Sequence, residues 1–192
     1  LLANDANIGI NALMMAAMNG HTNTVRLLLE NGANILWSGA VLIAASLNGH
    51  TETVQLLLEN GANIDTQSKN GRTALMIAAQ NGHTETAQLL LANSANIDVQ
   101  SNDGLTALMI TAQNNHTGIA QLLIEKGANI EAHYNNGATA LMIAAHRGHT
   151  ETVQLLLENG AEVDTQNMWC ETAVMIAARN GRAATVQLLL EK

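Results

Sequence analysis

Apolar and polar residues follow one another along the chain in blocks that return at a nearly constant interval. A Gly-His pair, or a variant of it, begins at residues 20, 49, 82, 115, 148 and 181, so the steps are 29, 33, 33, 33 and 33. The segment HTETVQLLLENGAN (50–63) matches HTETVQLLLENGAE (149–162) at all but the last position. Self-similarity of this period is typical of repeat proteins, in which each repeat packs on its neighbours.

Within one repeat the pattern predicts two short helices and a polar connection. Thr73 is a suitable N-cap, and ALMIAA (74–79) is apolar nearly all round, which predicts a helix buried between neighbours. Gly82 stands where this helix stops, because glycine reaches the left-handed backbone conformation without a Cβ penalty. Residues 83–91 predict a second helix with a leucine face. The segment IDVQSNDGL (97–105) is rich in turn residues and predicts a β-hairpin-like loop.

These motifs at this spacing resemble the ankyrin repeat family. The family pattern runs T-P-L-H-x-A-A, then G-H, a leucine triplet and G-A-D/N, and the segments here are TALMIAA (73–79), GH (82–83), LLL (89–91) and SAN (94–96). The resemblance covers essentially the whole chain. It implies an all-α ankyrin-repeat solenoid of stacked antiparallel helix pairs with β-hairpin-like loops.

The chain departs from the family pattern in two respects. It contains no proline, and the family's histidine slot holds methionine in five repeats and Ile43 in another. We interpret the methionines as flexible core filler, because the unbranched thioether adapts to irregular gaps. They are Met14, Met76, Met109, Met142 and Met175.

The repeat frame predicts one domain over residues 1–192, but it is incomplete at two places. Six residues of the frame are absent after Ile8 and four after Ile35. We interpret both deficits as hairpin tips missing from the numbered chain, and ordinary Cα spacings of about 3.8 Å at both joins would contradict this. The predicted divisions are the tail of a preceding repeat at 1–8 and repeats at 9–35, 36–68, 69–101, 102–134, 135–167 and 168–192.

Composition narrows the classes of partner and compartment. The chain is 47% hydrophobic, enough for a sizeable core, and its net charge is −8. Nucleic-acid affinity comes largely from Lys and Arg, and the eight here are scattered along the sequence, so we expect no nucleic-acid partner. No apolar stretch approaches a membrane span, so we expect no membrane partner. The single cysteine, Cys170, favours a reducing compartment, hence a cytoplasmic location, with secretion into a host cell left open.

No residue pattern predicts catalysis, a metal or a cofactor. The sequence has no nucleophile elbow, no phosphate-binding glycine loop and no His-Glu-x-x-His motif. Packed helices lie about 8–10 Å apart, whereas zinc needs ligand nitrogens about 2 Å from one ion, so histidines one repeat apart cannot share a metal. We predict instead that the histidines of the shared slot link repeat to repeat by hydrogen bonds. They are His21, His50, His83, His116 and His149.

The aromatic residues indicate where a partner binds. All three lie in predicted hairpin segments and none in a predicted core helix. Trp and Tyr on a protruding edge are typical interface anchors, although each ring could instead pack flat on the next hairpin. Because neighbouring repeats lie about 10 Å apart, His133, Tyr134, Met168 and Trp169 are predicted to form one patch.

In the ankyrin family, partners commonly dock on the hairpin tips and on the concave face made by the first helices. Residues that differ between repeats at those slots are the natural candidates. The candidate partner-binding residues are Trp37, Lys69, Arg72, Leu105, His133, Tyr134, His146, Met168, Trp169 and Arg179.

The predicted function is therefore a protein–protein interaction scaffold that is not itself an enzyme. We expect a monomer that binds another protein, and self-association through uncapped ends stays open. One alternative is a substrate-recruiting region of a larger enzyme or effector, because the chain starts late in one repeat and stops within a second helix. Another is a designed or consensus-like array without a natural partner. The fourth repeat, with Thr111, Asn115 and Gly118 at slots usually held by other residues, is expected to open first.

Overall fold

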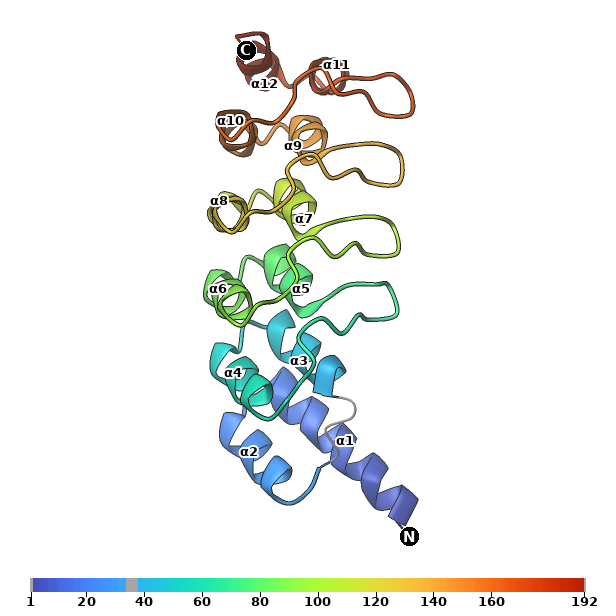
Figure 1. The fold of residues 1–192 in the computed structure, drawn as a ribbon, viewed down its shortest axis with the longest axis vertical. Helices are drawn as coiled ribbons and strands as arrows, with labels where there is room; N and C mark the ends of the chain where they lie inside the picture. Colours follow the sequence, from blue (N-terminus) through green and yellow to red (C-terminus); the bar gives the residue numbers. More distant parts are fainter. Residues whose placement is uncertain (1, 34–37, 192) are drawn as a thin grey trace. The chain divides into compact units, whose positions relative to one another are not determined.

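The computed structural model describes residues 2–33 and 38–191, which form twelve α-helices and no β-strand (Figure 1). The helices alternate between a first and a second member of six pairs. The first helices are α1 (Leu2–Met18), α3 (Ser38–Leu47), α5 (Ala74–Asn81), α7 (Ala107–Asn114), α9 (Ala140–Arg147) and α11 (Ala173–Arg179). The second helices are α2 (Thr22–Glu30), α4 (Thr51–Glu59), α6 (Thr84–Ala92), α8 (Thr117–Glu125), α10 (Thr150–Glu158) and α12 (Ala183–Leu190).

The chain divides into two compact units, unit 1 (Leu1–Asn96) and unit 2 (Ile97–Lys192). In unit 1, α3 packs between α1 and α5, and α4 packs between α2 and α6. In unit 2, α9 and α10 take the corresponding central places (Figure 1). Each unit is a stack of helix pairs, which confirms the predicted all-α repeat architecture. The predicted single domain over residues 1–192 and the repeat boundaries within it stay predictions.

Helices α5, α7 and α9 begin and end where the sequence predicts. The hydroxyl of Thr73 accepts from the backbone N–H of Met76 at 3.3 Å, and Thr106 and Thr139 cap α7 and α9 in the same way. Helix α5 ends at Gly82, whose φ of 74° lies in the left-handed region. Asn115 takes that conformation at the end of α7, with φ of 59°, because its short polar side chain tolerates it better than most.

The core is built from alanine, leucine, valine, isoleucine and methionine. Met76, Met109 and Met142 are 1%, 1% and 2% exposed, which confirms the core-filler interpretation for these three repeats. The core-filler interpretation is wrong for Met175, which is 53% exposed, because α9 packs on one side of α11 and no further described first helix packs on the other. Small alanine side chains let neighbouring first helices approach closely. Ala78 and Ala79 of α5, for example, are both fully buried.

Hydrogen bonds between successive repeats run through the shared histidine slot. Nε2 of His50 lies 3.0 Å from the carbonyl oxygen of Met18, and Nε2 of His83 lies 3.0 Å from that of Leu47. In unit 2, Nε2 of His149 lies 3.3 Å from the carbonyl oxygen of Gln113. The predicted repeat-to-repeat role is confirmed for these three histidines.

Two further ladders tie the second helices and the loops together. Threonine hydroxyls pair across adjacent second helices, for example Thr51 with Thr86 at 2.9 Å and Thr117 with Thr152 at 3.1 Å. A loop carboxylate caps the next loop, since the side chain of Asp65 accepts from the backbone N–H of Asn96 at 2.9 Å. Asp98 and Glu131 do the same one and two repeats later.

Four of the described loops that lead from a second helix to the next first helix are hairpin-shaped turns. In the loop between α4 and α5, the N–H of Ser68 donates to the carbonyl of Arg72 at 2.9 Å, and the N–H of Gly71 donates to the carbonyl of Ser68 at 2.8 Å. The same pair of bonds recurs in the turns at 101–105, 134–138 and 167–171. The fourth position of each turn has positive φ, which is held by Gly71, Gly104, Gly137 and Cys170.

Helix α1 differs from the expected first helix. The sequence frame predicts a helix that begins at Ala12 after a preceding tail at 1–8, whereas α1 runs without interruption from Leu2 to Met18. No proline stands between Asn7 and Asn11, and one interior glycine, Gly9, costs a helix only about 1 kcal/mol. The residues that would form a hairpin between Ile8 and Gly9 are not in the sequence. A continuous helix then lets the backbone N–H and C=O groups of this segment form hydrogen bonds with one another. The other proposed gap, at Ile35–Leu36, lies outside the described residues.

Candidate partner-binding surface

The hairpin tip before α11 presents two large apolar side chains. Met168 is 66% exposed and Trp169 is 61% exposed. Their turn is held from within, because the side-chain oxygen of buried Asn167 accepts from the N–H groups of Trp169 and Glu171, at 2.9 and 3.0 Å. The scaffold therefore fixes the backbone while leaving both side chains open to a partner.

The preceding tip lies directly against this one. The N–H of Met168 donates to the carbonyl of Asn136 at 2.9 Å. A Cβ placed on Gly137 would be 3.3 Å from Cα of Asn167, a tight contact that the two backbones could relieve only by moving a few tenths of an ångström apart. His133 is exposed and Tyr134 is half-buried in this preceding turn. The structure thus places the four residues of the predicted aromatic patch on two adjoining hairpins, which project beside the first helices in Figure 1.

The other predicted tip residues have different surroundings. Lys69 is exposed and Arg72 is half-buried, with its guanidinium hydrogen-bonded to the side chain of Gln80. Leu105 is only 8% exposed, so its assignment as a contact residue is corrected. Burial of an apolar side chain removes its surface from water, which stabilises the fold. Trp37 lies outside the described residues.

The last turns of the first helices form a second row of repeat-specific side chains. Met18 and Leu47 in unit 1 are 41% and 40% exposed. In unit 2 the same slot holds Gln113, His146 and Arg179. Arg179 forms an ion pair with Glu171, at the same two slots that Gln80 and Arg72 occupy in unit 1. This pair connects the hairpin of the exposed tryptophan with the first-helix row.

Positive charge gathers around His146. Partial burial, and then the charges of Arg147, Arg179 and Arg182, hold the pKa of His146 below its ordinary value of 6.5. Nε of Arg182 donates to the carbonyl of His146 at 3.2 Å, so residues of adjacent repeats meet here. Sequence reasoning selected His146 and Arg179 but missed Arg147 and Arg182. The signal was available, since both arginines replace residues that recur in the other repeats.

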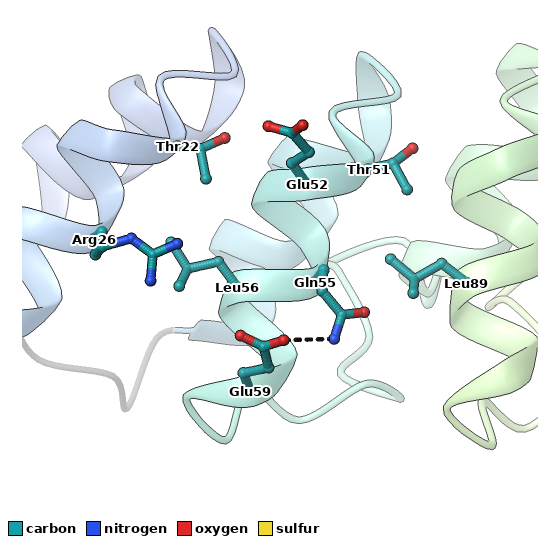
Figure 2. Close-up of a pocket in the computed structure, with 8 residues that line it drawn as sticks. All are labelled: Thr22, Arg26, Thr51, Glu52, Gln55, Leu56, Glu59 and Leu89. Carbon is teal, nitrogen blue, oxygen red and sulfur yellow. Dashed lines mark hydrogen bonds between the residues drawn. The ribbon is translucent and has the colours of Figure 1, made fainter.

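A shallow hollow in unit 1 lies between the second helices (Figure 2). Its volume is about 400 Å³, and Figure 2 shows Arg26 extending from α2 toward α4 while Gln55 is hydrogen-bonded to Glu59. Thr22 and Thr51 occupy equivalent slots of successive repeats, as do Leu56 and Leu89. The hollow is therefore the groove that stacked second helices leave between them, and it brings together no reactive set of side chains.

The described residues offer no further chemical centre. Among them, no group of three or more His, Cys, Asp or Glu side chains could hold a metal ion. Across 2–33 and 38–191, none of the helices combines the length and the apolar character that crossing a membrane requires. Cys170 is an exposed free thiol.

Comparison with known proteins agrees with the helix-pair architecture. The family model for ankyrin repeats in three copies matches residues 1–68, 41–134 and 131–192, which together cover the chain. No match was found among curated proteins. With helix pairs stacked in both units and the family pattern matched from end to end, the chain belongs to the ankyrin repeat family.

Proposed function

We propose that this protein is an interaction scaffold that binds another protein through hairpin tips and first-helix ends, with Met168 and Trp169 as the central anchor. The observation that carries the proposal is their exposure, 66% and 61%. The buried core uses aliphatic side chains and methionine, so the tryptophan at this tip does not serve core packing. Tryptophan is among the residue types most enriched where binding energy concentrates.

The mechanism is rigid presentation of these side chains. The hairpin that carries Trp169 is fixed by the Asn167 side chain and by the backbone bond from Met168 to Asn136. A surface that is already ordered loses little conformational entropy on binding, so more of the contact energy contributes to affinity. Ankyrin repeats generally act as protein–protein interaction modules, which supports this class of function.

Affinity capture tests the proposal. The wild-type chain and a Met168→Ala/Trp169→Ala variant are used to retain proteins from a lysate, followed by mass spectrometry. We expect a protein that the wild type retains and the variant loses. The matched control is Met15→Ala/Leu27→Ala, which removes two side chains of similar exposure, 67% and 61%, from unit 1. Circular dichroism establishes that all three chains are folded.

Two results would contradict the proposal. If both variants retain the same protein as the wild type, the anchor is not at the tip before α11. If the control variant loses the protein as completely as the tip variant, the loss reflects general removal of apolar surface rather than a site.

A further inference from the structure

Three arginines of unit 2 depart from the chain's own repeat pattern. Arg147 stands where the other repeats have asparagine, Arg182 stands in the shared histidine slot, and Arg179 stands where the other repeats have Met, Leu, Gln or His. These arginine positions belong to two successive repeats. Together they make up three of the chain's eight Lys and Arg residues, in a protein of net charge −8.

The structure gathers these three side chains, which we call the arginine cluster, around one site. Helices α9 and α11, which end at Arg147 and Arg179, pack against each other. Arg182 reaches back to the last turn of α9, where its Nε donates to the carbonyl of His146 at 3.2 Å. Its Cδ lies 2.6 Å from where a Cβ would stand on Gly148. All three arginines are exposed.

Arg182 takes over the repeat-to-repeat bond of the histidine slot, but scaffold requirements do not account for Arg147. Asparagine at the slot of Arg147 usually closes the helix end, as when Asn81 Nδ2 donates to the carbonyl of Ile77 at 2.9 Å, or Asn180 to Ile176 at 2.7 Å. Within the described part of the chain, the side chain of Arg147 makes no hydrogen bond or ion pair. Cations near a helix C-terminus are favourable by only about 0.3–1 kcal/mol, and α5 and α7 end without any.

The cluster also lies next to the exposed tip. Arg179 is ion-paired to Glu171, which belongs to the same hairpin as Met168 and Trp169. The Arg179 side chain is 59% exposed and that of Glu171 is 22% exposed. Ion pairs open to solvent contribute about 0–1 kcal/mol, so the open side of Arg179 can take a second carboxylate at little cost. A ligand that crosses this surface therefore meets an apolar tip at one end and cationic side chains at the other.

We propose that the arginine cluster binds an acidic peptide segment of the partner protein, next to an apolar side chain that rests on Met168 and Trp169. This rests on the proposed function and names the chemistry of the partner. Guanidinium groups pair well with carboxylates, often through two parallel hydrogen bonds. Nucleic acid is the less favoured anion, because the remaining surface of this acidic chain repels a long phosphate backbone.

Fluorescence anisotropy with defined probes tests the inference. The probe is a fluorescein-labelled peptide in which Glu and Asp flank a central Leu-Trp, and its counterpart carries Gln and Asn instead. The test variant is Arg147→Asn/Arg179→Gln/Arg182→His, in which each position takes a residue that the slot holds in other repeats. The matched control is Arg26→Glu/Lys126→Gln, which lowers the net charge by the same three units at positions outside the candidate partner-binding residues.

We expect the wild type and the control variant to bind the acidic probe alike. The test variant should bind it about tenfold more weakly, which corresponds to the loss of three exposed ion pairs. The amide probe should bind the wild type as weakly as the acidic probe binds the test variant. Raising NaCl from about 50 to about 300 mM should weaken only the acidic complex of the wild type and control.

Four outcomes would overturn the inference: no binding of the acidic probe to the wild type, equal binding of both probes, equal binding by the test variant, or equally tight binding of an oligothymidylate of the same charge. The capture experiment separates this failure from failure of the proposed function. A partner lost by Met168→Ala/Trp169→Ala but fully retained by the triple arginine variant would leave the scaffold function standing without an acidic ligand.

Discussion

The imidazole of His83 lies against the backbone of Gly49 in the preceding repeat. A Cβ on Gly49 would be 2.6 Å from Nδ1 of His83, while Nε2 of the same ring is 3.0 Å from the carbonyl oxygen of Leu47. The glycine and the histidine of the recurring Gly-His pair therefore belong to one contact that spans two repeats. The pair needs glycine for space as well as for its positive φ.

This contact predicts different costs for two glycines with similar backbone conformations. Gly49 and Gly61 have φ of 70° and 83°, but nothing lies within 4 Å of a Cβ on Gly61. Gly61→Ala should therefore cost only the left-handed strain, about 1 kcal/mol. Gly49→Ala should lower the free energy of unfolding by roughly 3 kcal/mol, because overpacking adds to that strain.

Urea denaturation measures both variants, and Gly49→Ala/His83→Ala provides the control. His83→Ala removes the imidazole ring that the new Cβ would meet. The double variant should therefore be more stable than the summed effects of Gly49→Ala and His83→Ala predict. Equal costs for Gly49→Ala and Gly61→Ala would show that backbone conformation alone fixes the glycine.

Cys170 occupies a turn position that glycine holds in the three preceding hairpins. Its φ is 58°, and Gly137 has φ of 79° at the same slot. Because a side chain in the left-handed region costs about 1–2 kcal/mol, Cys170→Gly should raise the free energy of unfolding by about 1 kcal/mol. Cys170→Ala keeps the Cβ and should leave it nearly unchanged. A stabilisation by alanine as large as that by glycine, in urea denaturation, would exclude backbone strain as the cause.

The threonine ladder predicts a measurable coupling between Thr51 and Thr86. Their hydroxyls are 2.9 Å apart, and Thr86 is 1% exposed. Thr51→Val leaves a buried hydroxyl without this partner and should cost about 1 kcal/mol, whereas valine at both positions should cost little more than one change. A double-mutant cycle by urea denaturation should give about 1 kcal/mol of coupling. Additive costs would mean that the hydroxyl pair contributes nothing.

Two helical glycines predict opposite responses to alanine. Gly118, in the first turn of α8, has nothing within 4 Å of a Cβ, so Gly118→Ala should stabilise unit 2 by up to about 1 kcal/mol. It should also slow hydrogen exchange at the amides of α8. Gly39→Ala, in the first turn of α3, should destabilise unit 1 because its Cβ would collide with the side chain of Thr66. If Gly118→Ala changes neither stability nor exchange, this glycine does not lower the stability of the fourth repeat.

The lowered pKa of His146 predicts that the folded protein loses a little stability as the pH falls. Its pKa is lowered from 6.5 in the folded chain, so the unfolded chain takes up the proton first as the pH falls. The loss begins near pH 6.5 and is complete below the folded-state pKa. Arg147→Asn removes one of the neighbouring charges and should raise the pKa, as NMR titration of the ring would show. A pKa that stays unchanged in this variant would leave burial and the charges of Arg179 and Arg182 as the causes.

Much of the fold could be predicted from the repeat pattern because its determinants are local or periodic. A threonine at the start and a glycine at the end of ALMIAA (74–79) mark helix boundaries whatever surrounds them, and the structure has α5 at Ala74–Asn81. The extent of α1 could not be predicted in this way. The repeat frame assigned residues 1–8 to a preceding tail, but the backbone there follows the local helix preference of the residues present.

The sequence by itself determined the family, the positions of the repeating helices from α4 onward and the linking role of the shared histidine slot, because these follow from a period of 33 residues and from capping chemistry. Only the tertiary structure decided which of the predicted surface positions are buried, such as Leu105. It also decided which charged residues far apart in the sequence come near one another, such as Arg147 and Arg182 around His146. The physical reason is that burial and electrostatic potential depend on what the neighbouring repeat places against a residue, and stacking sets that arrangement.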